Sequence, residues 1–226
     1  MSKEIELKFA VRGPADFDAL VRRLDLPARE FHTTVMQVSH FFDTRDFALH
    51  AKELVLRLRE EMGLYSLAFK GGEVRRTEDG VATERLELEV RLAPNVAVDI
   101  LRGTVSPRSA LQQRIGEQNP DALTLLDEAL ARRELHYVGQ IENRRTRLKP
   151  VEVDVAGKRI PLVFELDRTR FSTERTDYEV EVELGTTTDP AAAHAAVAGL
   201  LADAGIEWRS APSKAKRFFD LLRSKR

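Results

Sequence analysis

Cysteine is absent from all 226 residues of the chain. Without it the protein has no disulfide bonds, no thiolate nucleophile and no zinc site with cysteine ligands. Nothing therefore places it in an oxidising compartment. Its first residues, MSKEIE, contain no apolar signal core, and no apolar run approaches the roughly 20 residues that span a bilayer. We expect a cytoplasmic protein that has no membrane partner.

Net charge is also nearly absent, because 36 basic and 37 acidic residues leave a formal charge of −1. A chain without a strong field of one sign is not drawn to nucleic acid, so we expect no nucleic-acid partner. Charged residues nevertheless make up 32% of the sequence, so their positions are more informative than their sum. The sequence leaves the oligomeric state open, a homodimer included.

Alternation of charged and apolar side chains is the dominant pattern of the chain. It is found at 4–9, 54–59, 85–92 and 179–184, and a period of two predicts antiparallel strands. Further strands are predicted at 35–43, 64–70, 140–148 and 159–171. The total is about eight strands, the number that closes into a small barrel.

Apolar residues at helical spacing lie between and after these strands. Helices are predicted at 14–26, 189–204 and 212–223, and one or more at 97–133, where Pro107 and Pro120 break the pattern. The chain shows no repeat and no clear linker. We therefore expect residues 1–226 to form a single domain with a helical insertion at about 94–135.

The charged faces of the predicted strands decide which side of the barrel is polar. A single strand with alternating charge usually turns that face to solvent. Here the pattern repeats on seven strands, and the amphipathic helices need an apolar surface to cover. A charged interior with helices outside satisfies both requirements. The inward charges would be Glu4, Glu6, Lys8, Arg57, Arg59, Lys70, Arg85, Glu87, Glu89, Arg145, Arg147, Asp167, Glu179, Glu181 and Glu183, while Glu165 and Arg91 could equally lie at the rim.

A barrel lined with charged side chains must contain water or a bound ligand, because each unpaired buried ion costs several kcal/mol. Arginine and lysine suit a polyanion, since the guanidinium group makes bidentate hydrogen bonds with phosphate. Carboxylates repel phosphate, but two of them spaced i and i+2 on a strand lie about 7 Å apart. They can hold a hard divalent cation through oxygen ligands. A triphosphate bound with metal accounts for both signs of charge.

The motifs, taken in order, resemble those of the CYTH family, also called triphosphate tunnel metalloenzymes. Glu4-Ile5-Glu6-Leu7-Lys8 resembles the N-terminal Glu-x-Glu-x-Lys signature of that family. The other similar segments are Phe41-Phe42-Asp43-Thr44, Leu56-Arg57-Leu58-Arg59, Phe69-Lys70, Arg85-Leu86-Glu87-Leu88-Glu89, Glu179-Val180-Glu181-Val182-Glu183 and Ser213-Lys214. Two features depart from the family: Ala215 follows Ser213-Lys214 where tyrosine is frequent, and the stretch 94–135 is longer than in compact members.

The resemblance implies an α+β fold, an eight-stranded antiparallel β-barrel tunnel with a charged interior, covered outside by helices. It also implies roles for individual residues. Glu4, Glu6, Lys8 and Lys70 would be catalytic. Phosphate would be held by Lys8, Arg57, Arg59, Lys70, Arg85, Arg145, Arg147 and Lys214. The metal ligands would come from Glu4, Glu6, Glu87, Glu89, Asp167, Glu179, Glu181 and Glu183.

The activity implied is metal-dependent hydrolysis of inorganic triphosphate to pyrophosphate and phosphate, with Mg²⁺ or Mn²⁺ as cofactor. The same family also contains thiamine triphosphatases and class IV adenylyl cyclases, which need a platform for an organic group. With 7% aromatic residues, the sequence shows no clustered aromatic motif of that kind. A sensor that binds polyphosphate or a nucleotide without turnover is a further alternative, although binding alone would not require so many carboxylates.

Overall fold

The computed structural model describes residues 2–25, 32–76, 82–115, 120–185 and 188–224. Within these ranges, the side chains of Glu4, Arg85 and Glu87 lie outside the described part of the molecule. The strands are β1 (Ser2–Val11), β2 (His32–Asp43), β3 (Val55–Glu61), β4 (Leu64–Arg76), β5 (Ala82–Leu92), β6 (His136–Leu148), β7 (Val151–Val155), β8 (Lys158–Arg170), β9 (Thr176–Leu184) and β10 (Arg209–Ser210). The helices are α1 (Pro14–Arg23), α2 (Ala48–Ala51), α3 (Pro94–Leu101), α4 (Pro107–Ile115), α5 (Pro120–Leu130), α6 (Pro190–Asp203) and α7 (Lys214–Arg223).

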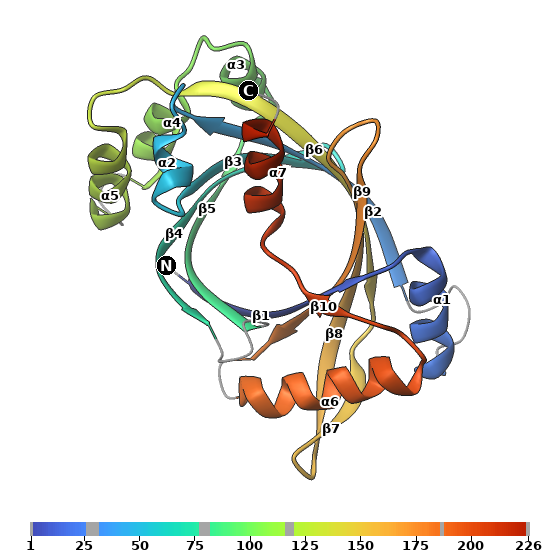
Figure 1. Cartoon of the computed structure of the whole chain (residues 1–226). Coiled ribbons are helices and arrows are strands. Elements are labelled where there is room, and N and C mark those ends of the chain that lie inside the picture. Colours follow the sequence, from blue (N-terminus) through green and yellow to red (C-terminus); the bar gives the residue numbers. More distant parts are fainter. Residues whose placement is uncertain (1, 26–31, 77–81, 116–119, 186–187, 225–226) are drawn as a thin grey trace.

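Eight antiparallel strands pair in the order β1-β5-β4-β3-β2-β6-β8-β9. Strand β9 also pairs with β1, so the pairing returns to its first strand. Figure 1 shows these strands as a ring. The predicted antiparallel barrel tunnel is confirmed. Two short strands were not predicted: β7 forms a hairpin with β8, and β10 pairs with two residues of β1.

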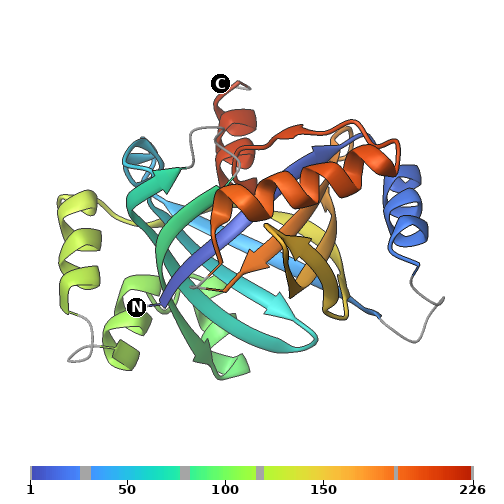
Figure 2. The ribbon, with the colours of Figure 1, turned by 90° about the horizontal axis from the view of Figure 1, so that it is seen from below.

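Helices cover apolar outward faces of the ring on two sides (Figure 2). On one side, Leu7 and Phe9 of β1 belong to a buried cluster with Val197 of α6. On the other, Leu58 of β3 belongs to a cluster with Leu126 of α5. Each such buried side chain contributes about 1.5–3 kcal/mol. The helices therefore lie outside the barrel, as the sequence predicted.

The last helix, α7, lies against the ring (Figure 1). Aromatic side chains make this contact. Phe218 stacks on Phe41 of β2, with the ring centroids 4.9 Å apart. Gly139 of β6 faces the same ring, and a Cβ atom at this position would lie 2.9 Å from Phe218. Its φ of +138° is a further reason for glycine here. This cluster fixes the helix to the barrel.

Several helix boundaries differ from those predicted. Pro107 and Pro120 are the first residues of α4 and α5, because proline fits the first helical turn, where its missing N–H is not needed. Helix α1 ends at Arg23 rather than at residue 26, and the one-turn helix α2 was not predicted. No helix in the described ranges has the length and apolar character needed to cross a bilayer. The single-domain organisation stays a prediction.

Candidate functional site

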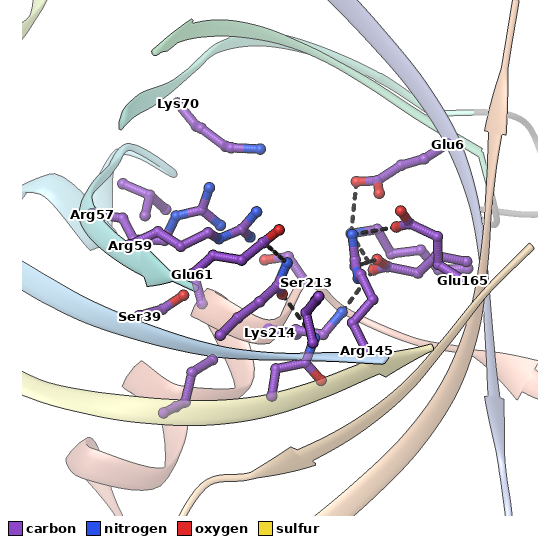
Figure 3. A pocket seen from close by; sticks show the side chains of 18 of the residues that line it. Glu6, Ser39, Arg57, Arg59, Glu61, Lys70, Arg145, Glu165, Ser213 and Lys214 are labelled. Carbon is purple, nitrogen blue, oxygen red and sulfur yellow. Dashed lines mark hydrogen bonds and ion pairs between the residues drawn. The ribbon is translucent and has the colours of Figure 1, made fainter. Parts of the chain in front are cut away.

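A cavity of about 300 Å³ lies inside the ring, and every strand of the ring contributes to its wall. Figure 3 shows charged side chains that converge on it from opposite sides. The residues singled out from the sequence that line it are Glu6, Lys8, Arg57, Arg59, Lys70, Glu89, Arg145, Arg147, Glu181, Glu183 and Lys214. Alternation along each strand produces this lining, because side chains of one parity point inward.

One wall of the cavity is cationic. Arg57 and Arg59 extend from β3, and Lys70 extends from β4 beside them (Figure 3). The Nε atom of Arg59 is buried and has no hydrogen-bond acceptor among the described residues. A buried donor of this kind is normally satisfied. Its presence beside an open cavity indicates a site for an anionic ligand.

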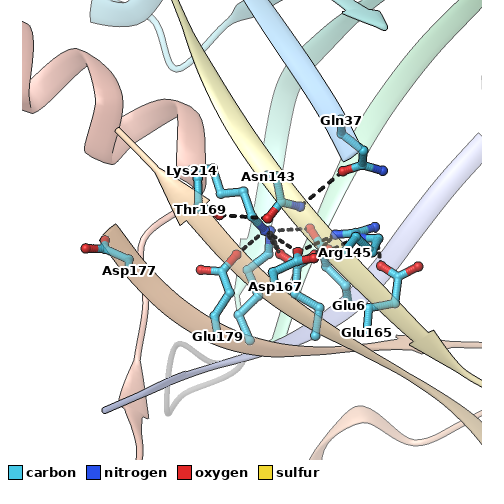
Figure 4. A network of polar contacts seen from close by, with 12 residues as sticks. Glu6, Gln37, Asn143, Arg145, Glu165, Asp167, Thr169, Asp177, Glu179 and Lys214 are labelled. Carbon is cyan, nitrogen blue, oxygen red and sulfur yellow. Dashed lines mark hydrogen bonds and ion pairs between the residues drawn. The ribbon is translucent and has the colours of Figure 1, made fainter. Parts of the chain in front are cut away.

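The opposite wall holds three cations that are already paired with carboxylates. Figure 4 shows two of them, Arg145 and Lys214. Lys8 Nζ lies 3.2 Å from Glu181. Arg145 donates two hydrogen bonds to Asp167, at 2.9 and 2.6 Å, and also contacts Glu181. Lys214 Nζ lies 2.8 Å from Asp167 and 2.8 Å from Glu181. This wall therefore combines both signs of charge.

Asp167, Glu179 and Glu181 form a buried acidic cluster beneath Lys214. Burial raises the pKa of a carboxyl group, and nearby cations lower it. For Glu181, the cations Lys214 and Lys8 outweigh burial and hold its pKa well below the usual range. For Glu179, burial prevails and the pKa is raised. Burial lowers the pKa of Lys214, but the three carboxylates outweigh it and raise that pKa well above its usual range.

Helix α7 positions two cations over this cluster. Ser213 caps the helix, since its hydroxyl accepts a hydrogen bond at 3.2 Å from a backbone N–H of the first turn. Lys214 and Arg217 are three residues apart and share one helix face. Arg217 donates to Asp177 at 2.6 Å and also contacts Glu179. The capped helix end thus holds Lys214 at the cavity wall.

The end of the cavity away from α7 reaches solvent. The side chains of Arg147 and Glu183 are there 52% and 49% exposed. Arg147 Nε donates to Glu165 at 2.8 Å. Glu6 stands opposite Glu183 in the β1–β9 register and pairs with Lys8 at 2.7 Å. A polar ligand can enter from this mouth.

Not every predicted residue lines the cavity. Asp167 and Glu179 are buried behind it. Glu89 does line the cavity, but its side chain is exposed. The side chains of Glu4, Arg85 and Glu87 lie outside the described residues, although their backbones pair β1 with β5. The functional roles of all these residues stay predictions.

Several polar residues of the cavity were not predicted from the sequence. These are Thr33, Gln37, Ser39, Glu61, Asn143 and Ser213, and Glu165 joins them although it was placed equally at the rim. The alternation of side chains along each strand could have identified some of them, because Asn143 is two residues before Arg145 and therefore lies on the same face of its strand. Glu61 lay beyond the predicted end of its strand at residue 59. Arg217 was not singled out either, although it is buried and lies three residues after Lys214.

The donor set suits a hard divalent cation. One carboxylate oxygen from each of Asp167, Glu179 and Glu181 lies within 4.8 Å of the other two. Oxygen ligands from carboxylates are those that Mg²⁺ and Mn²⁺ prefer. The oxygens are at present shared by Lys214, so a metal ion bound here would replace or accompany an ammonium group.

Comparison with known proteins agrees with this geometry. The family model of the CYTH domain matches residues 2–219. A Bacillus subtilis (strain 168) protein named "Putative triphosphatase YjbK" is 37% identical over 71 residues, or 31% of this chain. That match spans 36% of the curated relative, about a third of its length.

Two solved structures share the fold. HpAC1 from Hippeastrum, described as a "putative adenylyl cyclase" with a dominant triphosphatase activity, has a TM-score of 0.72 and 26% identity. The similarity covers 96% of this chain and 95% of that one. A "putative adenylate cyclase" from Bacillus halodurans has a TM-score of 0.61 at 22% identity, covering 97% and 100% of the two chains. At this identity the second structure shows the fold alone.

Proposed function

The chain belongs to the CYTH domain family, and from this premise we propose that it hydrolyses inorganic triphosphate to pyrophosphate and phosphate with a divalent metal ion. The observation that carries the proposal is the pair of facing walls in the cavity. One wall is cationic, and the other sets cations over buried carboxylates. Hydrolysis of a phosphoanhydride needs positioning and charge neutralisation more than a covalent nucleophile.

The cations have distinct tasks in this proposal. Arg57, Arg59 and Lys70 bind phosphate oxygens from one side of the tunnel, and Arg59 gains an acceptor for its buried Nε atom. Arg145 and Lys214 contact the phosphate chain from the other side while they remain fixed by carboxylates. The substrate is thereby held straight between two walls, which reduces the entropy lost on reaching the transition state.

The acidic residues are proposed to hold the metal. Asp167, Glu179 and Glu181 supply oxygens from the buried side, and Glu6 and Glu183 supply them from the mouth. When bound, a divalent ion supplies charge neutralisation for the phosphates and lowers the pKa of a water molecule. The cationic side chains orient the phosphates, and Lys214 and Lys8 keep Glu181 ionised by lowering its pKa.

Inorganic triphosphate is favoured over an organic triphosphate by the cavity lining. Among the described residues, Phe41 is the only aromatic side chain in the lining, and it stacks on Phe218 rather than facing the mouth. A base or thiazole ring would therefore find no stacking platform in this part of the chain. The dominant triphosphatase activity described for HpAC1 supports hydrolysis rather than cyclisation.

A substrate panel tests the proposal. Phosphate and pyrophosphate release is measured from tripolyphosphate, thiamine triphosphate and ATP, each with Mg²⁺, Mn²⁺ or chelator. Metal-dependent phosphate release from tripolyphosphate at a rate well above the other two supports the proposal. Pyrophosphate release from ATP with a cyclic product would assign a cyclase instead. If none of the three substrates releases phosphate or pyrophosphate, a sensor without turnover would be favoured.

A further inference from the structure

A row of hydrogen-bonded side chains crosses four neighbouring strands inside the barrel. Gln37 stands opposite Glu61 of β3 and Asn143 of β6, and Asn143 stands opposite Thr169 of β8. Thr169 donates to Asn143 at 3.0 Å, Asn143 donates to Gln37 at 3.1 Å, and Gln37 donates to Glu61 at 2.6 Å. Figure 4 shows the part of this row from Thr169 to Gln37.

Every donor in the row points towards the carboxylate at its end. Gln37, Asn143 and Thr169 are 3%, 3% and 0% exposed, so their amide and hydroxyl groups depend on one another for hydrogen bonds. An acceptor-only group at the end completes such a row. The row therefore holds Glu61 in one orientation, with its side chain in the cavity (Figure 3).

Glu61 follows the two arginines on the wall of β3. The inward residues of this strand are Val55, Arg57, Arg59 and Glu61 in sequence, and successive inward side chains lie about 7 Å apart. Val55 belongs to the apolar cluster with Phe218 at the α7 end. The wall thus changes from apolar to cationic and then to anionic as it approaches the β3–β4 turn.

Glu61 differs from the buried acids of the tunnel in its partners. Glu181 and Asp167 each contact at least two cations. No lysine or arginine within the described ranges forms an ion pair with Glu61, and its hydrogen bond comes from the neutral amide of Gln37. Its negative charge therefore acts on whatever lies beside it in the cavity.

We propose that Glu61, oriented by Gln37 and Asn143, limits the length of the phosphate chain that the tunnel accepts. This inference rests on the proposed function. A triphosphate bound between Arg57, Arg59 and the opposite wall has its charge matched by cations. Each further phosphoryl group would extend the chain towards the turn and bring another negative charge beside Glu61. Like charges repel one another, so a chain longer than triphosphate should bind less tightly there.

The test compares tripolyphosphate with tetrapolyphosphate in the full-length wild type and in E61Q. This substitution removes the charge but keeps an oxygen that can accept the hydrogen bond from Gln37. The matched control is E60Q, because Glu60 neighbours Glu61 on β3 and does not line the cavity. Values of kcat/KM are measured with Mg²⁺, and dissociation constants are measured by titration calorimetry in chelator.

Wild type is expected to prefer tripolyphosphate in both measurements. E61Q should shift the preference towards tetrapolyphosphate on the order of tenfold, and E60Q should leave it unchanged. Replacing Gln37 by leucine should give a smaller shift in the same direction, because the carboxylate loses its orientation but keeps its charge.

Three results would overturn the inference. E61Q could fold normally and keep the wild-type ratio, or it could weaken both ligands equally. In parallel titrations with thiamine triphosphate and ATP, E61Q could also lose affinity for these two ligands alone, which would mean that Glu61 binds an organic group. If the wild type hydrolyses no triphosphate but E61Q still shifts the ratio of dissociation constants, the proposed function fails and the length limit stands.

Discussion

The ammonium nitrogen of Lys214 lies 2.8 Å from a carboxylate oxygen of Glu181 and also contacts Asp167 and Glu179. The first residue of a helix thus contacts all three members of an acidic cluster whose oxygens lie close enough together to hold a metal ion. Ammonium and metal ion would neutralise the same three oxygens. We therefore expect the two cations to compensate for one another in stability.

Replacing Lys214 by methionine tests this compensation. Without the ammonium group, three buried carboxylates lose a shared partner, and the free energy of unfolding should fall by about 3–5 kcal/mol in chelator. Mn²⁺ should restore part of that loss. Denaturant unfolding with and without Mn²⁺ measures both effects. K216M is the control, since Lys216 is 48% exposed and pairs only with Asp220 in the described structure. An equal loss in both conditions would contradict metal binding at this cluster.

Replacing Glu181 by glutamine should separate binding from turnover. The substitution removes one proposed metal ligand, so kcat for tripolyphosphate should fall on the order of a hundredfold. The cationic wall is unchanged, so the affinity for tripolyphosphate in chelator should remain within a few-fold of wild type. Steady-state kinetics measures kcat, and calorimetry measures the affinity for tripolyphosphate. E152Q, on the exposed face of β7, should behave as wild type. Full turnover in E181Q would remove this residue from the mechanism.

Replacing Arg59 by alanine should weaken substrate binding without destabilising the fold. Its buried Nε atom has no acceptor in the described structure, so little native hydrogen bonding is lost. One charge-assisted hydrogen bond to phosphate is worth about 1.5–3 kcal/mol, which predicts a rise in KM of roughly 10- to 100-fold. Thermal unfolding should change little. R168A, at an exposed position of β8, serves as the charge-matched control. An unchanged KM would argue against phosphate binding on this wall.

Replacing Ser213 by alanine should affect both stability and activity. The cap of α7 is lost, which costs about 1 kcal/mol, and Lys214 is then less firmly placed over the acidic cluster. A fall in kcat that accompanies the lower unfolding temperature is expected. S109A removes an exposed hydroxyl of α4 and should change neither quantity. A stability loss without any change in kcat would show that the cap does not position Lys214.

Much of the fold could be predicted because charge and apolarity alternate so regularly. The run 4–9 already assigned Glu6 and Lys8 to one face and Leu7 and Phe9 to the other, and the structure has them so. The helices followed from their apolar stripes. The ends were less certain, because proline at 107 and 120 can either start a helix or stop one.

The partners of each side chain could not be predicted, because they depend on the register between strands. The row from Glu61 through Gln37 and Asn143 to Thr169 joins residues of four strands through the register between them. Nothing local distinguishes Gln37 from a solvent-facing strand residue. The contact of Lys214 with the acidic cluster likewise depends on where α7 packs.

Hydrolysis of tripolyphosphate with Mg²⁺ and after addition of excess chelator is the most direct measurement of the central claim. The claim predicts release of phosphate and pyrophosphate in equal amounts with Mg²⁺, its loss in chelator, and its recovery when Mg²⁺ or Mn²⁺ is restored. Hydrolysis that continues unchanged in chelator would contradict the proposed role of the buried carboxylates, and so would a protein that binds tripolyphosphate but never cleaves it.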